Sequence, residues 1–183
     1  MVVKRCGDKI VTIRKITKKD LVNAKQFLDF VNSIVEEEAK VLMNKKLTLR
    51  EEREYLGKTL VGMKKKTGVY LVAECDGRVV GTTEIKLCKA KQSHVGTFGI
   101  IVRQEYRGIG VGTCLMDEIL RLAKKEISPT PKIISLGVYA NNKPAIGLYK
   151  KMGFKTVARI PKQLQHKGKL IDEAVMLLYL KRV

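Results

Sequence analysis

The chain has 183 residues, of which 45% are apolar and 30% are charged, a composition typical of globular proteins that excludes the disordered and collagen-like classes. Its 37 basic residues against 18 acidic ones give a net charge of +19, which favours phosphate-bearing ligands, nucleic acid or acidic partners. The longest stretch without a charged residue, 92–102, has about half of the roughly 20 residues that a membrane-spanning helix needs.

The N-terminal third is predicted to contain one strand and two helices. Apolar and polar residues alternate over residues 9–14, as in a half-buried strand. Thr17 and Asp20 form a capping-box-like start for a helix that runs to the mid-30s. A second helix is predicted over residues 48–66, because its apolar residues recur at helical spacing and glutamates follow its start.

A hairpin and a further strand are predicted next. The β-rich runs 69–75 and 78–88 flank Asp76 and Gly77, and Asp-Gly between two such runs is a strong hairpin signal. The run 95–103 is almost entirely apolar and is the third run of this kind. These runs therefore predict three consecutive strands in the middle of the chain.

The C-terminal half is predicted to alternate helices and strands. A helix over residues 108–126 carries its apolar residues in one stripe, and a strand over 132–139 follows two prolines that end the helix. Asn142 caps a helix over 144–152, which stops at Gly153. Two strands joined by a polar loop with Gly168 are expected to end the chain, 154–160 and 174–180.

Together these elements predict an α/β protein with a mixed sheet of about seven strands and with about four helices over its faces. The sequence has no internal repeat and no linker, so we expect a single domain over residues 1–183. The strand, glycine turn and helix at residues 95–126 would form its centre.

The cysteines and the N-terminal residues give no sign of an oxidising compartment. The four cysteines include no C-x-x-C pair and are accompanied by two histidines, so we expect neither a metal site nor a disulfide framework. Cys75, Cys88 and Cys114 lie in apolar segments, where a free cysteine usually acts as a small buried hydrophobe. Charged residues throughout the first fifteen positions leave no apolar signal-peptide core, and we expect the chain to stay in the cytoplasm.

A glycine-rich turn separates the third apolar strand from the helix that follows it. Gly108, Gly110 and Gly112 alternate there, so several backbone N–H groups converge at the positive end of a helix dipole, a geometry that binds phosphate. A plain tight turn is the alternative. A P-loop is excluded because Thr113 stands where its lysine would be, and a dinucleotide fingerprint is excluded because the strand 132–139 has no acidic residue.

Two motifs in this region resemble those of a known family. The first is similar to the acyl-coenzyme A signature of the GNAT superfamily of N-acetyltransferases and has the sequence Ile100-x-Val102-x-x-x-x-Arg107-Gly108-x-Gly110-x-Gly112. The second resembles a later motif of the same family and has the sequence Asn142-x-x-Ala145-x-x-Leu148-Tyr149-x-x-x-Gly153-Phe154. The order of elements resembles that family over residues 9–180, and the motifs cover residues 95–155.

The resemblance implies acetyl-CoA as the cofactor. The backbone of three strand residues would run beside the pantetheine arm like an added strand: Ile100, Ile101 and Val102. Main-chain N–H groups of the loop would hold the diphosphate: Arg107, Gly108, Ile109, Gly110, Val111 and Gly112. Asn142 would contact the arm and Tyr149 would lie by the sulfur, while a helix cap and core packing are the ordinary roles of such residues.

The resemblance also implies that a neutral amine attacks the thioester directly, through a tetrahedral intermediate. Tyr149 would protonate the departing thiolate as general acid. The general base stays open, because Thr97 stands where many members of the family have a glutamate. Glu84 on the neighbouring strand, His94 at the strand entrance and a chain of waters are the candidates, and a solvated strand glutamate and a loop histidine are the ordinary alternatives.

The acceptor would enter between the first two helices and the last hairpin, near Glu36, Glu37 and Glu38 and the loop 163–172. A carboxylate-lined entrance would suit a cationic amine, although such glutamates usually form a solvated helix face. We therefore expect an acetyl-CoA-dependent N-acetyltransferase that acts on a small amine or on a protein amino group. The alternative is a non-catalytic module that binds acyl-CoA, or nucleic acid through its basic surface, and a homodimer is left open.

Overall fold

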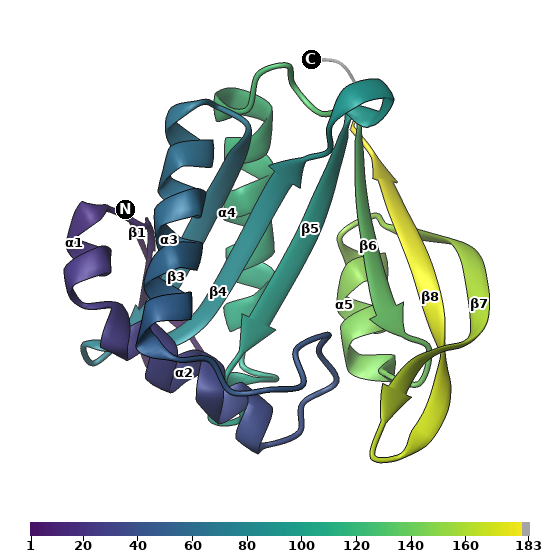
Figure 1. Ribbon diagram of the computed structural model, residues 1–183, viewed down its shortest axis with the longest axis horizontal. Coiled ribbons are helices and arrows are strands. Elements are labelled where there is room, and N and C mark those ends of the chain that lie inside the picture. The colour runs from purple at the N-terminus through teal and green to yellow at the C-terminus, as the bar shows by residue number, and fades with distance from the viewer. Residues whose placement is uncertain (181–183) are drawn as a thin grey trace.

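The computed structural model describes residues 1–180, which form one eight-stranded sheet with helices on both faces (Figure 1). In chain order the strands are β1 (Val2–Cys6), β2 (Lys9–Lys15), β3 (Gly68–Cys75), β4 (Arg78–Leu87), β5 (Val95–Val102), β6 (Ile133–Tyr139), β7 (Lys155–His166) and β8 (Lys169–Tyr179). In space their order is β1-β2-β3-β4-β5-β6-β8-β7. β5 and β6 are parallel, and the other neighbours are antiparallel, so the mixed α/β sheet predicted from the sequence is confirmed.

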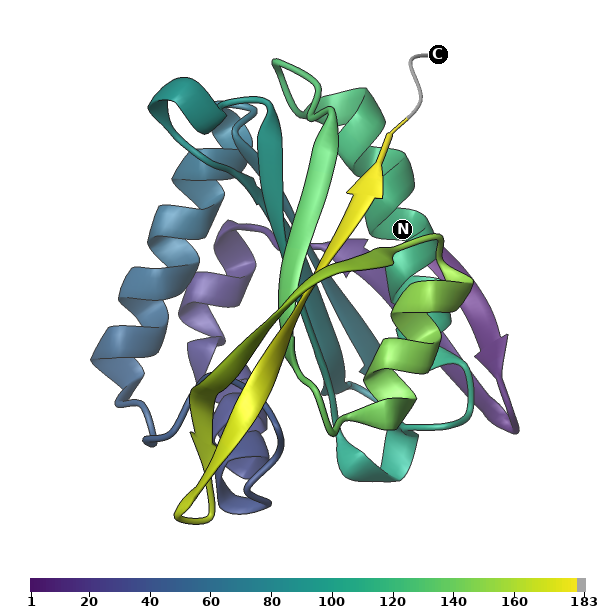
Figure 2. The ribbon, with the colours of Figure 1, turned by 90° about the vertical axis from the view of Figure 1, so that its right-hand side faces the viewer.

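Helices cover both faces of this sheet. They are α1 (Lys18–Val22), α2 (Ala24–Glu36), α3 (Leu49–Lys64), α4 (Val111–Glu126) and α5 (Lys143–Lys151), with short 3-10 turns η1 (Ala90–Gln92) and η2 (Gln104–Tyr106). Figure 2 shows α1, α2 and α3 on one side of the sheet and α4 and α5 on the other. We call the side of α1 to α3 the front face and the side of α4 and α5 the back face.

Each face has its own hydrophobic core, because successive strand residues point to opposite sides. On the back face, Leu115 and Ile119 of α4 pack with Ile85 and Ile134 of the sheet, and all four are fully buried. The front core joins α2 and α3 to β3 through Phe27, Phe30, Leu56, Tyr70 and Val72. Burial of this apolar surface is the main stabilising contribution to the fold.

β5 and β6 are paired at one end and separate at the other. Their ladder joins Val95 to Ile133, continues to Thr97 and Ser135, and ends there. β6 pairs with β8 along its whole length, whereas β5 beyond this point pairs with β4. The opening between the separated halves, visible in Figure 1, is called the gap below. One edge of β5 therefore faces the gap without a neighbouring strand.

The N-terminal region differs from the prediction in two places. The sequence analysis did not predict β1, which pairs with β2 across a turn at Gly7. In β1 only Cys6 is buried, so the strand lacks the apolar alternation that would reveal it. The helix predicted from residue 17 to the mid-30s is two helices, because the backbone leaves the helical path at Asn23. The observed eight strands and five helices therefore correct the expected seven and four.

The last hairpin is longer than predicted. Its strands are joined directly by the turn residues Lys167 and Gly168, both with positive φ, in place of a long polar loop. β7 is exposed at nearly every position, so its sequence has no buried apolar stripe to mark it as a strand. A polar composition here indicates an exposed edge strand and not a loop.

Two further expectations concern membranes and cysteines. In the described part of the chain, no helix is long and apolar enough to cross a membrane. The cysteines are free, and Cys6 and Cys75 are buried while Cys88 and Cys114 are partly buried. The sulfur atoms of Cys6 and Cys114 lie 3.6 Å apart, so β1 contacts the first turn of α4.

A buried ion pair joins β2 to α1. Asp20 is 5% exposed and accepts hydrogen bonds from the guanidinium of Arg14 at 2.8 and 2.9 Å. The backbone N–H of Thr17 donates to the same carboxylate at 2.7 Å, and Arg14 also binds Glu74 on β3. Burial raises the pKa of Asp20, but the hydrogen bonds from Arg14 and Thr17 outweigh burial and hold the pKa below its ordinary value.

We expect Asp20→Asn to lower the free energy of unfolding by about 2 kcal/mol at pH 7, because it removes the charge that pairs with Arg14. The folded pKa lies below the unfolded value of about 3.9. The carboxylate therefore stabilises the fold above that pH, and this contribution is lost as the pH falls through the folded pKa.

Denaturant unfolding of the wild type and of Asp20→Asn from pH 7 to pH 3 measures this effect. The two free energies should converge in the acid range. Asp29→Asn removes an exposed partner of Lys25 and should change stability by less than about 0.5 kcal/mol. A difference between wild type and Asp20→Asn that stays constant down to pH 3 would contradict the prediction.

Candidate active site

The glycine turn forms a sharp loop between β5 and α4. Gly108 and Gly110 have φ of 77° and 100°, which residues with side chains rarely adopt. A Cβ on either residue would meet no atom within 4 Å, so the backbone conformation requires glycine and the space beside the loop is open. Gly110 is the N-cap of α4, and the N–H groups of the first helical turn have no acceptor within the helix. This arrangement suits a phosphate.

The side chain of Arg107 holds the loop in place. Its Nε donates to the carbonyl of Val102 at 2.8 Å, and its guanidinium forms an ion pair with Glu37 at the end of α2. The charge of Arg107 is therefore balanced inside the protein. This leaves the main-chain groups of the loop as the donors for an anion.

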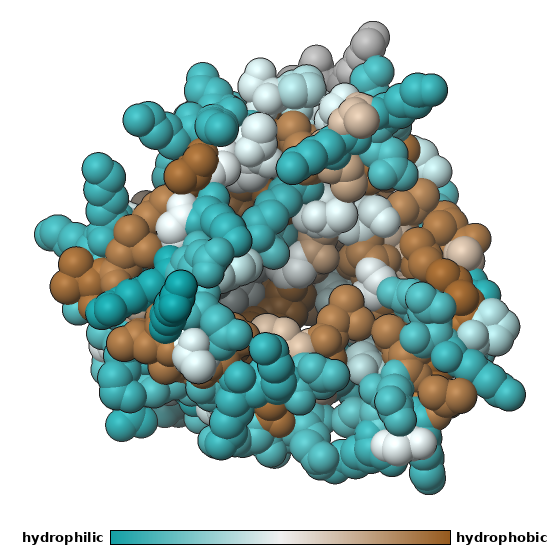
Figure 3. Space-filling model, in the orientation of Figure 1, coloured by the Kyte–Doolittle hydropathy of each residue, from teal (hydrophilic) through white to brown (hydrophobic). Residues whose placement is uncertain are grey.

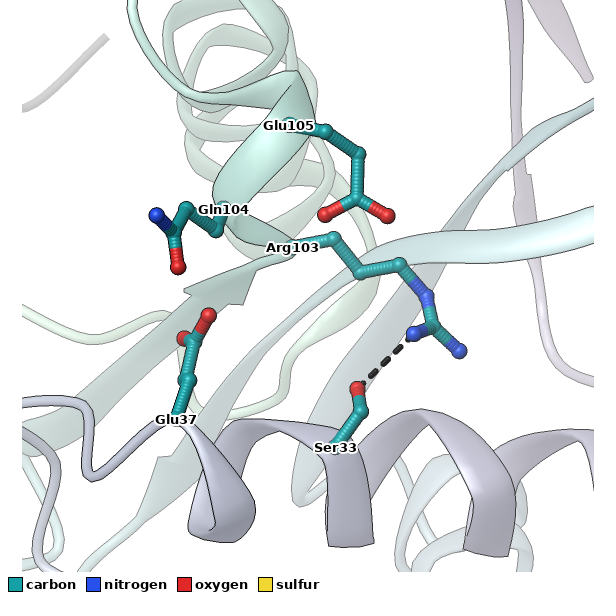
Figure 4. A pocket seen from close by; sticks show the side chains of 5 residues that line it. All are labelled: Ser33, Glu37, Arg103, Gln104 and Glu105. Carbon is teal, nitrogen blue, oxygen red and sulfur yellow. Dashed lines mark hydrogen bonds between the residues drawn. The ribbon is translucent and has the colours of Figure 1, made fainter.

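A polar pocket of about 540 Å³ lies beside the loop, between α2 and η2 (Figure 4). Arg103 extends across it and donates to the hydroxyl of Ser33 at 2.8 Å. Figure 4 shows Glu37 and Glu105 extending into it from opposite sides. With two carboxylates and one guanidinium, this pocket does not favour an anion.

Glu84 lies on β4, one strand away from the gap. It pairs in register with Gly99 of β5, whose missing side chain leaves the front face open beside it. Its Oε2 accepts a hydrogen bond from the hydroxyl of Tyr55 on α3 at 2.7 Å and lies 2.7 Å from Nζ of Lys86. Burial, together with nearby Tyr70 and Glu84, raises the pKa of Tyr55 far above its ordinary value. Tyr55 therefore stays a hydrogen-bond donor, and Oε1 of Glu84 takes no part in these contacts.

Tyr149 lies on α5, on the back side of the gap. Its ring centroid is 6.0 Å from those of Phe98 and Phe154, and the residue is 8% exposed. Burial raises its pKa to about 12. At neutral pH Tyr149 is therefore a neutral phenol, able to donate a proton and unable to act as a base. Phe98 directly precedes Gly99, so Tyr149 is at the level of the gap.

The remaining candidates for the base lie elsewhere. His94 is exposed on the turn before β5, where its carbonyl accepts hydrogen bonds from Lys132 and Ile133. Five residues of strand separate it from Gly99, about 16 Å at 3.3 Å per residue, so the structure does not bring it together with Glu84. Thr97 is exposed and donates to the carbonyl of Lys86.

The candidate cofactor residues border the gap. Ile100, Ile101 and Val102 belong to the half of β5 that pairs with β4 on one side and has no strand on the gap side, and they lead toward the glycine loop. Asn142 follows β6 and caps α5, because its side chain accepts from the N–H of Ala145 at 3.4 Å. Asn142 therefore has its ordinary role as a cap, and it lies at the gap end of β6.

The loop 37–48 connects the two halves of the molecule in front of the gap. The hydroxyl of Tyr139 on β6 lies 3.5 Å from the carbonyl oxygen of Val41 in this loop, and Nζ of Lys40 in the loop donates to the carbonyl of Asn141 after β6. Figure 3 shows a hollow near the centre of this side, with hydrophobic atoms inside it and both hydrophilic and hydrophobic residues around it. The three glutamates expected at the entrance each have a cationic partner: Glu36 with Lys46, Glu37 with Arg107 and Glu38 with Lys167.

Two residues at the gap were missed by the sequence analysis. The helical spacing of Tyr55 with Leu56, Leu60 and Met63 indicates only a place among the apolar residues of its helix, yet its hydroxyl donates a hydrogen bond to Glu84. Glu173 of β8 lies over Gly137 of β6 so closely that a Cβ on Gly137 would overlap its carboxylate. A glycine inside an apolar strand marks a close approach of this kind, so Gly137 was the signal in the sequence.

The sequence model of the acetyltransferase (GNAT) family matches residues 32–154. The chain belongs to this family. In the GNAT structure of yncA from Salmonella typhimurium, solved with its cofactor acetyl-CoA, the fold is the same: the TM-score is 0.80 at 19% identity, over 94% of this chain and 95% of that one.

Two curated relatives are similar in sequence to this GNAT chain. L-amino acid N-acetyltransferase AaaT of Escherichia coli is 35% identical over 107 residues, 58% of this chain and 65% of that protein. An N-alpha-acetyltransferase of Sulfurisphaera tokodaii is 35% identical over 106 residues, 52% of this chain and 61% of that protein. The aligned regions therefore span less than two thirds of these relatives.

Replacing glycine by alanine should change stability in opposite directions at two positions, one in the loop and one in α3. We expect Gly110→Ala to lower stability by about 1–2 kcal/mol, because alanine is strained at positive φ. Gly57→Ala, inside α3 where a Cβ meets nothing within 4 Å, should raise it by about 0.5–1 kcal/mol. Denaturant unfolding measures both, and a Gly110→Ala variant as stable as the wild type would contradict the loop conformation.

Proposed function

We propose that this protein is an N-acetyltransferase that transfers the acetyl group of acetyl-CoA to a primary amine of a small molecule or a protein. The main support is one continuous feature, the half of β5 that faces the gap and leads into a glycine loop at the start of α4. The family match supports it independently. The relatives are named for two kinds of acceptor, L-amino acids and α-amino groups, and leave the acceptor open.

The residues around the gap fit acetyl-CoA. Ile100, Ile101 and Val102 offer backbone groups to the pantetheine arm on the unpaired edge of β5, in the manner of an added strand. The N–H groups from Arg107 to Gly112 hold the diphosphate at the positive end of α4. When bound, acetyl-CoA supplies a thioester whose carbonyl carbon accepts the amine.

Tyr149 is the proposed general acid. Its phenol keeps its proton at neutral pH, since burial raises its pKa to about 12, and the aromatic contacts with Phe98 and Phe154 fix the ring. Without a proton donor, the sulfur of a bound thioester would have to leave as a thiolate, a poorer leaving group than the thiol. Tyr149 delivers this proton, and solvent restores it afterwards.

Glu84 is the proposed general base. An alkylammonium of pKa about 10.4 is neutral in about one molecule in two thousand at pH 7, so a group beside the gap has to accept its proton. Oε2 of Glu84 is held by Tyr55 and Lys86, which leaves Oε1 to accept the proton directly or through a water. The position of Glu84 beside Gly99 supports this role over that of the distant His94.

A second candidate function is a non-catalytic module that binds acyl-CoA, or nucleic acid through its surface of net charge +19. Such a protein would release no coenzyme A. The decisive experiment measures free thiol from acetyl-CoA with amino acids, polyamines and peptides as acceptors. Binding of nucleic acid with a steep salt dependence, together with no stabilisation by acetyl-CoA, would favour the second function.

Binding of acetyl-CoA should raise the melting temperature of the wild type by about 5–10 °C at a concentration 100 times Kd. Gly110→Glu should abolish this shift, because a carboxylate at the loop repels the phosphates. Gly57→Glu places the same charge on α3 and should keep the shift. A Gly110→Glu variant that is stabilised as strongly as the wild type would show that the loop does not bind the cofactor.

Tyr149→Phe should lower kcat by about 10²- to 10⁴-fold, because it removes the proton donor and keeps the ring. Its melting temperature should stay close to that of the wild type. Tyr179→Phe removes the hydroxyl of an exposed tyrosine and should leave kcat unchanged. Steady-state release of coenzyme A measures both variants, and a Tyr149→Phe variant that is fully active on every accepted amine would contradict the assignment.

A further inference from the structure

Two glycines face each other across the gap at the same level. The ladder between β5 and β6 pairs Val95 with Ile133 and Thr97 with Ser135. Continued by two residues, this register places Gly99 level with Gly137, just beyond the point where the strands separate. Both glycines belong to the front face, because their neighbours Phe98 and Leu136 are buried in the back core. Neither wall of the gap therefore has a side chain of its own at this level.

A glutamate lies beside the glycine of each wall. Glu84 is the partner of Gly99 on the neighbouring strand, and its Cγ lies 3.8 Å from a Cβ built on Gly99. Glu173 reaches from β8 over Gly137, where its carboxylate occupies the space of the missing side chain. Because glycine stands at both positions, two carboxylates from separate parts of the sheet border one opening.

Among the described residues, no cationic side chain pairs with the carboxylate of Glu173. The residue is partly exposed. The preceding Asp172, in contrast, is bound by Arg159 at 2.7 Å and by the backbone N–H of Lys162 at 3.0 Å. A carboxylate that borders an opening without a cation attracts a cation from solution.

The nearby lysines do not remove this excess of negative charge. Nζ of Lys86 binds Glu84, and Nζ of Lys167 binds Glu38. Lys40 donates to the carbonyl of Asn141 behind the loop 37–48. The balance at the level of Gly99 and Gly137 is therefore one lysine against two carboxylates.

We infer that Glu173 and Glu84 form a two-carboxylate acceptor site, which binds the acceptor as an ammonium and excludes amines that carry a carboxylate beside the reacting nitrogen. Glu173 holds the ammonium from the β6 side, and Glu84 takes its proton from the β5 side. The substrate class is cationic primary amines without a neighbouring carboxylate, such as amino groups of peptides and polyamines. Free amino acids are poor acceptors. This inference rests on the proposed acetyl transfer and specifies its acceptor.

The test compares L-alaninamide with L-alanine, which differ in the charge beside the amine. The wild type should prefer the amide by at least about 100-fold in kcat/KM, because repulsion by the two carboxylates adds to the lower amine pKa of the amide. Glu173→Gln should lower this preference about tenfold, chiefly through a higher KM for the amide with little change in kcat. The difference in amine pKa between the two acceptors is the same for both proteins. Dividing the preference of the variant by the preference of the wild type therefore removes its contribution.

Two variants serve as controls. Asp117→Asn removes one exposed negative charge from α4 on the other side of the sheet and should leave the preference unchanged. Glu173→Asp keeps the charge on a shorter side chain, which withdraws it from Gly137, and it should also lower the preference. It supplies the same comparison if Glu173→Gln does not fold.

The outcomes separate this inference from the proposed function. A wild type that accepts L-alanine as well as L-alaninamide, or a Glu173→Gln variant that keeps the full preference, overturns the two-carboxylate site while acetyl transfer stands. A wild type that releases no coenzyme A with any amine overturns the proposed function, and the inference with it.

Discussion

The short parallel ladder between β5 and β6 is the constraint on which the site depends. Parallel strands in a sheet normally pair along their common length, and here the pairing stops at Thr97 and Ser135. β6 pairs with β8 along its whole length, so the edge of β6 that faces away from β5 stays paired where β6 separates from β5. The aromatic cluster of Phe98, Tyr149 and Phe154 lies behind the separation point, and the loop 37–48 crosses in front of it. Side chains from distant segments thus meet at one place.

The sequence predicted the features that are encoded locally. The hairpin at Asp76 and Gly77, the strand leading into the glycine loop, and the helix capped by Asn142 are all present, because turn and cap chemistry depends on a few adjacent residues. β1, the break at Asn23 and the length of β7 were not predicted. Their residues are mostly exposed, so no pattern of burial appears in the sequence.

In the site, too, features encoded by neighbouring residues were predicted, whereas contacts between residues far apart in the sequence were not. The glycine loop and the position of Tyr149 follow from motifs within residues 95–155. The contact of Tyr55 with Glu84 and the approach of Glu173 to Gly137 join residues that lie more than 25 positions apart, and periodicity carries no information about such pairs. The ion pairs that the glutamates expected at the entrance form with lysines and Arg107 could not be foreseen from the sequence either.

The uncovered edge of β5 also bears on how the protein avoids aggregation. An open strand edge is a template for pairing with other chains, and this sheet has two outer edges, at β1 and β7, as well as the edges of β5 and β6 that face each other across the gap. The outer edge at β7 is interrupted by Pro161 and by two register shifts, and the outer edge at β1 carries Lys4 and Arg5. The inner edge of β5 has neither device. It faces β6 across the gap, with the loop 37–48 in front, and this enclosure keeps the edge of a second sheet from pairing with it.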